Sequence, residues 1–436
     1  IETVLQNAYE ARNKWKETSL NERKKIISNF VKSFLSNNEE IVENLCKQIG
    51  RPISQCPGEM RGFEERANYM INNADRALED VVSRKDSEFD NYIKKEPLGT
   101  IFVIAPWNYP FNTSVNSIVP SLLSGNTVIL KHSSQTPLCA EQLFDAAIKA
   151  SLPKNIFQFL HLDHSSTSKV ISDNRINHVL FTGSVSGGKE IKKSIGTRFI
   201  GAGLELGGKD PAYVRSDCNL EHAIENLVDG SYFNSGQSCC GIERIYVDEH
   251  IFNKFVDGFK SITEKYILGN PLEENTNLGP VVRMNAAKYI RTQVSQALNK
   301  GAKNIIDSNK FKMDDGTNCY VSPSALIQVD HSMEFMKEET FGPTVGIMKV
   351  KNEEEAINLM NDSAYGLTAS IWTSDKEFAQ SMGSKIETGT FFMNRCDYLD
   401  PGLAWTGVKD TGIGVTLSVL GFDHLTRAKS YHIRTV

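Results

Sequence analysis

Short apolar runs alternate with amphipathic segments along the chain between residues 98 and 182. The runs have the length of buried strands, and the segments between them repeat apolar residues at helical spacing. We expect strands at 101–105, 127–131, 156–160 and 178–182, and helices at 113–124, 137–150 and 165–172. Because strands separated by helices usually run parallel, this pattern predicts a parallel sheet covered by helices, which is typical of nucleotide-binding folds.

A second round of alternation follows residue 207. We expect its helices and strands at 220–233, 251–266, 286–300, 244–247 and 345–350. Apolar residues at helical spacing over 2–50 predict a helical lead-in. The segments 89–95 and 429–436 alternate more weakly, and we expect them to pair as an arm. The predicted fold class is therefore α/β, with a Rossmann-like parallel-sheet domain, a second α/β domain and a small β arm.

Charge and apolar content narrow the classes of partner. The 436 residues include 48 Lys and Arg against 53 Asp and Glu, a formal net charge of −5 spread without long blocks. No basic stripe offers itself to nucleic acid or to an anionic membrane surface. No apolar run reaches the roughly 20 residues that a membrane span needs. We therefore expect neither nucleic acid nor membrane as a partner.

The cysteines and histidines give no metal or disulfide pattern. The eight cysteines include no C-x-x-C pair, which argues against a zinc ribbon or a disulfide framework. His161 and His164 lie three residues apart without a third ligand, so we expect no metal site. Reduced thiols and the absence of a visible secretory signal predict a cytoplasmic protein.

A glycine-rich turn at 183–189 follows the apolar run that ends at Thr182. Glycines there let the backbone approach a phosphate, whose charge is attracted by amide hydrogens at a helix N-terminus. The spacing nearly matches a P-loop, but Glu190 stands where that motif needs Ser or Thr. The turn predicts either a phosphate-bearing cofactor or an ordinary connection between a strand and a helix.

Three polar residues are candidates for chemistry. Cys239 follows Gly236 and small residues that would leave its thiol approachable, as a nucleophile requires. Glu205 is a lone acid between apolar residues and glycines, where burial is costly without a partner or a task. Asn108, just after the first strand, has an amide that can donate to a developing oxyanion. Taken singly, each also fits a structural role: a packing thiol, a surface turn, and a turn beside prolines.

Six segments, in their order along the chain, resemble the aldehyde dehydrogenase superfamily. They are Ala105-Pro106-Trp107-Asn108, Lys131, Phe181-Thr182-Gly183-Ser184, Leu204-Glu205-Leu206-Gly207-Gly208, Gly236-Gln237-Ser238-Cys239 and Glu339-Thr340-Phe341-Gly342-Pro343. The likeness runs from about residue 97 to residue 394. It implies an NAD(P)-dependent enzyme that oxidises a small-molecule aldehyde to a carboxylic acid.

The resemblance implies a role for each catalytic candidate. Cys239 is the expected nucleophile, and Asn108 with the backbone N–H of Cys239 would hold the oxyanion of a thiohemiacetal. Loss of hydride to the nicotinamide would leave a thioester. Glu205 matches the general base that activates water, so we expect water rather than coenzyme A to release the acid.

The same resemblance implies the contacts of NAD or NADP. The expected cofactor-binding residues are Trp107, Lys131, Ser134, Gly183, Ser184, Gly188, Leu206, Glu339 and Phe341. Ser134 departs from the family pattern, in which an acid grips the adenosine ribose. Because Ser134 would not repel a 2′-phosphate, we expect NADP to be tolerated.

The substrate is less defined. The expected pocket residues are Tyr109, Thr113, Asn116, Ser238, Cys240, Arg395 and Trp405. Arg395 offers a charge-assisted hydrogen bond to an acidic substrate, which would be a semialdehyde, or else points to solvent or to an acid of the chain. The segment 403–407 departs from the family's Pro-Phe-Gly-Gly stretch, so its relatives do not predict the substrate.

The resemblance also implies a domain plan. We expect a dinucleotide-binding domain of 1–78 and 98–206, a catalytic domain of 207–422, and an oligomerisation arm of 79–97 and 423–436. The arm would pair between subunits in a homodimer or homotetramer. Two other functions remain open, a P-loop-like nucleotide phosphotransferase and a catalytically silent relative. Against the first, Cys239 and Glu205 have no task in phosphoryl transfer.

Overall fold

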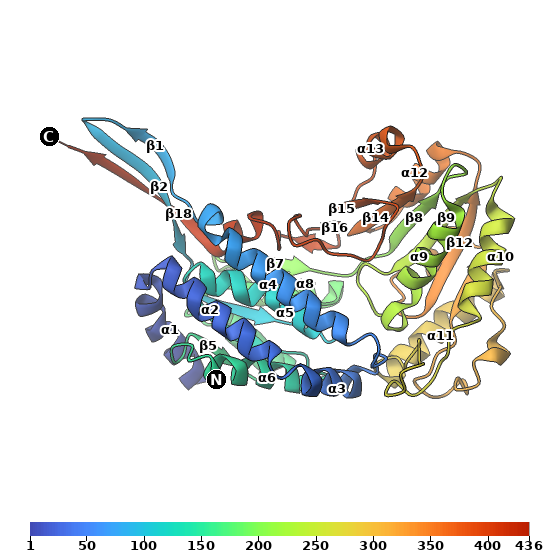
Figure 1. Ribbon diagram of the computed structural model, residues 1–436, viewed down its shortest axis with the longest axis horizontal. Coiled ribbons are helices and arrows are strands. Elements are labelled where there is room, and N and C mark those ends of the chain that lie inside the picture. Colours follow the sequence, from blue (N-terminus) through green and yellow to red (C-terminus); the bar gives the residue numbers. More distant parts are fainter. Residues whose placement is uncertain (436) are drawn as a thin grey trace.

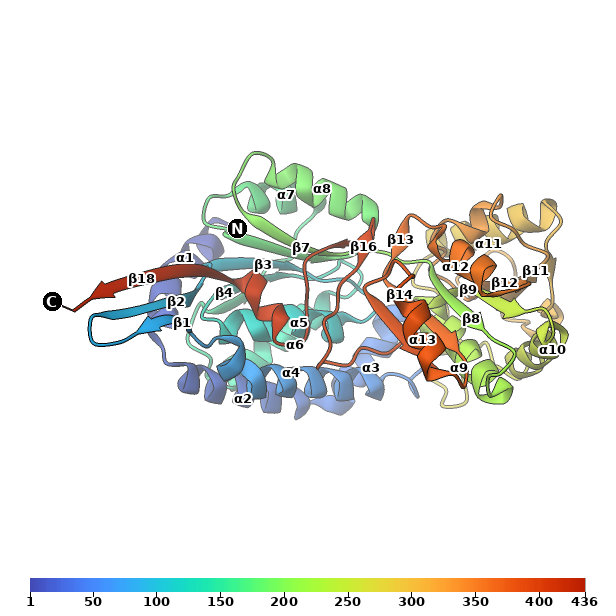
Figure 2. The ribbon, with the colours of Figure 1, turned by 90° about the horizontal axis from the view of Figure 1, so that it is seen from above.

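The protein has two sheet-centred lobes side by side and an arm that projects from one end (Figures 1 and 2). The computed structural model describes residues 1–435. The last residue of the predicted arm, Val436, lies outside the described residues. In the described part of the chain, no helix is long and apolar enough to cross a membrane. The predicted α/β fold class is confirmed.

The first lobe is built on a six-stranded sheet in the order β17-β7-β6-β3-β4-β5. Its strands from β3 to β7 are all parallel, as the alternation predicted. The short edge strand β17 runs antiparallel to β7. The bounds are β3 (Thr100–Ile104), β4 (Thr127–Lys131), β5 (Phe157–Phe159), β6 (His178–Thr182), β7 (Gly201–Glu205) and β17 (Gly412–Ile413).

Helices cover both faces of this sheet. Ile101 and Val103 of β3 pack in the core under α2, α4, α5 and α6, whereas Phe102 and Ile104 pack against α1, α7 and α8. Strands buried on both faces read as continuous apolar runs, which explains why the sequence predicted them well. The helices are α1 (Glu2–Glu17), α2 (Leu20–Leu35), α3 (Asn38–Ile49), α4 (Pro57–Ala77), α5 (Pro110–Leu123), α6 (Pro137–Lys149), α7 (His164–Ser172) and α8 (Val185–Ile195).

The second lobe holds a seven-stranded sheet in the order β10-β11-β12-β9-β8-β14-β15. Helices α9 and α10 pack on one face, and α12 and α13 pack on the other. The strands are β8 (Asp210–Val214), β9 (Ile242–Asp248), β10 (Lys303–Asn304), β11 (Ser324–Ile327), β12 (Thr344–Val350), β14 (Thr368–Trp372) and β15 (Thr390–Met393). The helices are α9 (Leu220–Tyr232), α10 (Phe252–Thr263), α11 (Met284–Asn299), α12 (Glu353–Asn361) and α13 (Lys376–Gly383).

The arm is a three-stranded antiparallel sheet of β1 (Val81–Lys85), β2 (Phe89–Pro97) and β18 (Thr426–Arg434). Strand β18 pairs with the whole of β2, from Thr426 opposite Pro97 to Arg434 opposite Phe89. The predicted pairing of 89–95 with the C-terminal segment is therefore confirmed for the described residues. The arm extends away from both lobes and leaves β1 and β18 as its edges (Figure 2).

The chain returns to the first lobe before it enters the arm. Gly412 and Ile413 pair with Glu205 and Leu204, so a segment inside the predicted catalytic range of 207–422 joins the first sheet. Two residues are too few to show a period in the sequence, which is why this strand was not predicted. The domain boundaries themselves stay predictions.

Candidate active site

A tight loop after α9 presents Cys239. The short 3-10 helix η1 (Phe233–Gly236) contains three residues of positive φ, namely Asn234 (53°), Ser235 (56°) and Gly236 (70°). A Cβ at Gly236 would lie 2.1 Å from the carbonyl oxygen of Gly342, so only glycine fits there. The loop leaves Cys239 half-buried and Cys240 buried.

Two cavities meet at Cys239. The first has a volume of about 550 Å³ and the second about 370 Å³. Both are lined by Thr113, Thr182, Glu205 and Cys239. The predicted nucleophile and the predicted base therefore face the same junction, from different lobes of the molecule.

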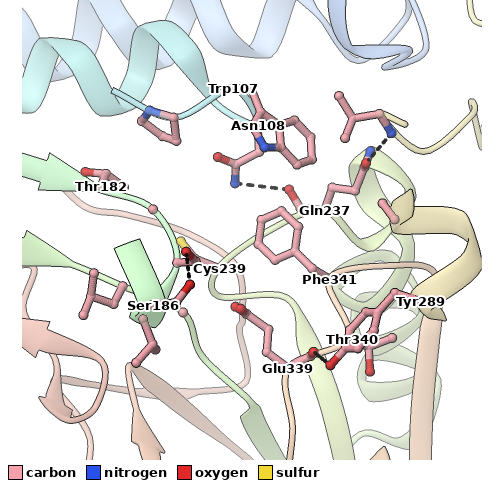
Figure 3. Close-up of a pocket in the computed structure, with 18 of the residues that line it drawn as sticks. Trp107, Asn108, Thr182, Ser186, Gln237, Cys239, Tyr289, Glu339, Thr340 and Phe341 are labelled. Carbon is pink, nitrogen blue, oxygen red and sulfur yellow. Dashed lines mark hydrogen bonds between the residues drawn. The ribbon is translucent and has the colours of Figure 1, made fainter. Parts of the chain in front are cut away.

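The first cavity brings together most of the predicted cofactor residues. Figure 3 shows Asn108, Cys239, Glu339 and Phe341 around one space. The predicted catalytic and cofactor-binding residues that line it are Trp107, Asn108, Gly183, Ser184, Glu205, Leu206, Cys239, Glu339 and Phe341.

Three predicted cofactor residues lie outside the walls of the first cavity, namely Lys131, Ser134 and Gly188. Lys131 ends β4 and Ser134 is exposed. Gly188 has a packing role, because a Cβ there would lie 2.7 Å from Cδ2 of Leu206. The glycine thus lets α8 approach the residue that follows β7.

The first turn of α8 faces the first cavity through Ser184, Val185 and Ser186. The Ser184 hydroxyl caps the helix by accepting a hydrogen bond from the Gly187 amide at 3.1 Å. Lys189, the lysine of the P-loop-like spacing, is 70% exposed and lies 3.7 Å from Asp410. It does not line the cavity. A lysine directed away from the site disfavours the phosphotransferase hypothesis, because a P-loop lysine must reach the phosphates.

Glu339 and Phe341 form the wall opposite α8. The Glu339 carboxylate accepts a hydrogen bond from the Gly208 amide at 2.9 Å. Burial, with the nearby charge of Glu243, raises the pKa of Glu339 to about 8. Phe341, held at a φ of 55°, packs edge-on against Trp107 with ring centroids 5.6 Å apart.

Asn108 is fixed beside the nucleophile loop. Its Nδ2 donates to the carbonyl oxygen of Gln237 at 3.2 Å (Figure 3), and its own carbonyl oxygen accepts from Arg51 and from Nδ2 of Asn234. Arg51 is buried and forms an ion pair with Glu59 at 2.7 Å. The buried amide is thus held next to the Cys239 loop by these hydrogen bonds.

Glu205 ends β7 and is held by two hydroxyl groups. Thr182 donates to its carboxylate at 3.1 Å, and Thr416 donates to the other oxygen. Burial raises the pKa of Glu205, while these hydrogen bonds and the charge of Arg66 lower it. Thr416 is in turn bonded to Trp405, whose amide and carbonyl exchange hydrogen bonds of 2.8 and 2.9 Å with it.

The two adjacent thiols differ in chemistry. The pKa of Cys240 is raised well above its ordinary value by its contact with the Cys239 sulfur and by burial. Its sulfur donates to Asp397 at 3.0 Å, and so does the hydroxyl of Ser238. A thiol that stays protonated is a poor nucleophile, which disfavours Cys240 in that role.

The second cavity contains six of the seven predicted pocket residues. They are Tyr109, Thr113, Asn116, Ser238, Cys240 and Trp405. Arg395 is not among the lining residues, and its guanidinium lies over the ring of Tyr398 at 3.5 Å. Sequence reasoning missed Arg51, Glu59, Arg61, Glu65, Arg66, Asp229 and Asp397, which also line this cavity. No local motif marks them, because tertiary packing alone brings them to the site.

The profile of the aldehyde dehydrogenase family matches residues 1–431. The chain belongs to the aldehyde dehydrogenase family. Within its described residues, this aldehyde dehydrogenase has no group of three or more His, Cys, Asp or Glu side chains arranged to hold a metal ion.

The aldehyde dehydrogenase is similar to enzymes that are named for different substrates. It is 32% identical over 421 residues to the succinate semialdehyde dehydrogenase [NAD(P)+] Sad of Escherichia coli, covering 97% of this chain and 90% of that protein. It is also 32% identical over 399 residues to the 3-sulfolactaldehyde dehydrogenase of Priestia aryabhattai, covering 90% of this chain and 82% of that protein.

Solved structures agree with the fold. The succinic semialdehyde dehydrogenase of Streptococcus pyogenes, crystallised with NADP+, matches this aldehyde dehydrogenase with a TM-score of 0.94 and 28% identity. The match covers 100% of this chain and 95% of that one. The predicted membership of an NAD(P)-dependent family of enzymes is therefore confirmed, while the roles of single residues stay predictions.

Proposed function

We propose that this aldehyde dehydrogenase oxidises an aldehyde to a carboxylic acid with NAD(P), through a covalent intermediate on Cys239 that water releases. The observation that carries the proposal is the position of Cys239 and Glu205 at the junction of the two cavities. One cavity is then available for the cofactor and the other for the aldehyde. A catalytically silent protein would have no need to retain a half-buried thiol at that junction.

The residues of the first cavity fit a nicotinamide dinucleotide. The first turn of α8 offers backbone amides and a favourable dipole to a pyrophosphate. Glu339 lies where a carboxylate can accept from ribose hydroxyls, and Phe341 and Trp107 provide apolar surface for a ring. When bound, NAD(P) supplies the acceptor for a hydride. Lys131 and Ser134 stay proposed contacts of the adenosine end, and Ser134 supports the use of NADP as well as NAD.

The chain's own groups account for the remaining chemistry. The Cys239 thiolate attacks the aldehyde carbon and forms a carbon–sulfur bond as the carbonyl π bond breaks, so the negative charge passes from sulfur to the carbonyl oxygen. Asn108 Nδ2 and the Cys239 amide are the proposed donors to that oxygen. Loss of hydride converts the adduct to a thioester. Glu205 then takes a proton from water, the resulting hydroxide attacks the thioester, and the Cys239 thiolate leaves.

Substitution of the nucleophile tests the proposal. Cys239→Ser should lower the rate of NAD(P)H formation from butanal or 4-oxobutanoate by at least about 1,000-fold, because a serine hydroxyl has no comparable activation there. The half-buried Cys319 lines neither cavity, so Cys319→Ser is the matched control and should retain most of the activity. Unchanged aldehyde oxidation by Cys239→Ser, with normal cofactor binding, would contradict the proposal. Running the assay with NAD+ and with NADP+ gives the cofactor preference.

A further inference from the structure

The second cavity contains an arginine that has no carboxylate partner. Arg66, on α4, lines this cavity and is only 9% exposed. Its one hydrogen bond among the described residues runs from Nη1 to the carbonyl oxygen of Asn112, at 2.8 Å. No carboxylate oxygen of that part of the chain lies within 4.0 Å of it.

Two fully buried arginines, Arg51 and Arg244, are satisfied within the protein. Arg51 forms its ion pair with Glu59 and also donates to Asn234 at 3.1 Å. Arg244 uses Nε and both terminal nitrogens on the carbonyl oxygens of Lys209, Leu359 and Met360. Arg66, with its single hydrogen bond, uses fewer of its N–H donors than Arg51 or Arg244 does. Burying a guanidinium without a counterion is costly, and burial indeed lowers the pKa of Arg66.

Arg66 shares the second cavity with the proposed reacting groups. The same cavity is lined by Glu205, Cys239 and Cys240, and the charge of Arg66 lowers the pKa of Glu205. Asn116 lines the same cavity, is 3% exposed and has an amide oxygen that accepts no hydrogen bond from the described residues. The wall of this cavity, which Cys239 also lines, therefore holds polar groups that the protein does not fully use.

The same cavity also contains acidic residues, which could instead bind a cationic ligand. Asp397 already accepts from Ser238 and Cys240, and Glu65 accepts from the Tyr398 hydroxyl at 3.1 Å. Asp229 opens onto the cavity, yet burial and Asp397 raise its pKa to about 6. These carboxylates are bonded or easily protonated, whereas Arg66 has no carboxylate oxygen within 4.0 Å among the described residues. The balance favours an anionic ligand.

We propose that Arg66 binds a carboxylate at the far end of the substrate, so that the enzyme acts on an aldehyde that carries a carboxylate. This inference rests on the proposed function. A carboxylate matches the fork of a guanidinium and supplies the missing counterion. It replaces the expectation for Arg395, which packs on Tyr398 outside the cavity walls.

Two aldehydes that differ only in the carboxylate separate carboxylate binding by Arg66 from a general effect on activity. The ratio of kcat/KM for 4-oxobutanoate to that for butanal should be at least about 10 in the wild type, since a charged hydrogen-bond donor is paired only by the first. Arg66→Gln should lower this ratio about 10-fold or more, chiefly through KM for 4-oxobutanoate, and Arg66→Lys should restore part of it. A common loss on both aldehydes cancels in the ratio.

Arg61→Gln is the matched control. Arg61 lines the same cavity, is exposed and forms no ion pair or hydrogen bond with other described residues, so its removal takes away one charge without a buried contact. The ratio should stay within about threefold of the wild-type value, as expected for a solvent-screened charge. Titration with NADPH checks that Arg66→Gln retains its fold.

Three results would overturn the inference. They are a wild-type preference for butanal, a preference for 4-aminobutanal, which would point to the acidic residues, and a ratio that Arg66→Gln leaves unchanged. Each of them leaves the proposed function standing, provided that Cys239→Ser abolishes turnover. A wild-type enzyme that oxidises none of the three aldehydes would instead contradict the proposed function itself.

Discussion

Two threonine hydroxyls hold the carboxylate of Glu205. Thr182 belongs to the end of β6, whereas Thr416 lies in the segment that returns to the first lobe. Hydroxyl donors stabilise the ionised carboxylate, which opposes the effect of burial. The two contacts therefore favour the deprotonated form that a general base requires.

Removal of one donor should weaken the base in acid. Thr416→Val takes away a hydrogen bond that lowers the pKa of Glu205, so the acid limb of the kcat–pH profile should move toward higher pH. At pH 6 we expect kcat to fall about 3- to 10-fold, with a smaller loss at pH 9. Thr416→Ser keeps the donor and should keep the profile. An acid limb that stays in place in Thr416→Val would show that Thr416 does not support the base.

At the scale of the element, a carboxylate from α4 caps α5. One Glu59 oxygen accepts from the amides of Phe111 and Asn112, both at 2.9 Å, and the other pairs with Arg51. The first turn of a helix has amides without intrahelical partners, and a buried carboxylate satisfies them well. The helix that follows Asn108 is thereby fixed to α4.

Loss of this cap should destabilise the protein strongly. Glu59→Gln leaves the buried Arg51 charge uncompensated, and we expect the free energy of unfolding to fall by about 3–5 kcal/mol. The surface pair of Lys24 and Asp75 gives the control, because Asp75→Asn should cost less than about 1 kcal/mol. Urea unfolding followed by circular dichroism measures both. Equal effects of the two substitutions would contradict the role of Glu59.

The sequence predicted some elements and missed others for physical reasons. Strands β3, β4 and β6 contain continuous apolar runs and were predicted to within one residue. Strand β7 reads Gly-Ala-Gly-Leu-Glu, whose glycines hide its period. Helix α4 was missed because it buries charged residues, among them Glu59 and Arg66, so its apolar stripe is interrupted.

Some residues of the candidate site could likewise be predicted from the sequence, and others could not. Cys239, Glu205 and Asn108 lie in local motifs that a single sequence displays, and the structure brings them together. Arg66 and Thr416 reach the site only through the packing of α4 and of the returning chain. Such contacts leave no local signature, so they could not be predicted.

At the scale of the whole molecule, the arm exposes unpaired strand edges. All five residues of β1 are exposed, and Val81 and Val82 are 54% and 61% exposed. Protruding apolar edge strands are readily covered by another chain. We propose that β1 contributes to pairing between subunits.

Charges on this edge should weaken the oligomer. Val81→Lys with Val82→Lys should raise the dissociation constant of the subunits by about 10-fold or more, because lysines on an edge strand oppose pairing. Sedimentation velocity over a range of concentrations measures the change. Leu272→Lys, at a residue of similar exposure in a loop of the second lobe, should leave the sedimentation unchanged. An effect of the loop substitution as large as that of the arm would contradict the assignment.

Backbone hydrogen bonds join Trp405, in the wall of the second cavity, to Thr416, whose hydroxyl bonds to Glu205. A substitution that reshapes this wall to admit a different aldehyde should therefore also move the Thr416 hydroxyl that bonds to Glu205. It should then change how readily Glu205 takes a proton from water. Substrate selectivity and turnover are thereby coupled in this enzyme. Efforts to redirect this enzyme to new substrates should expect altered pH optima among their first products.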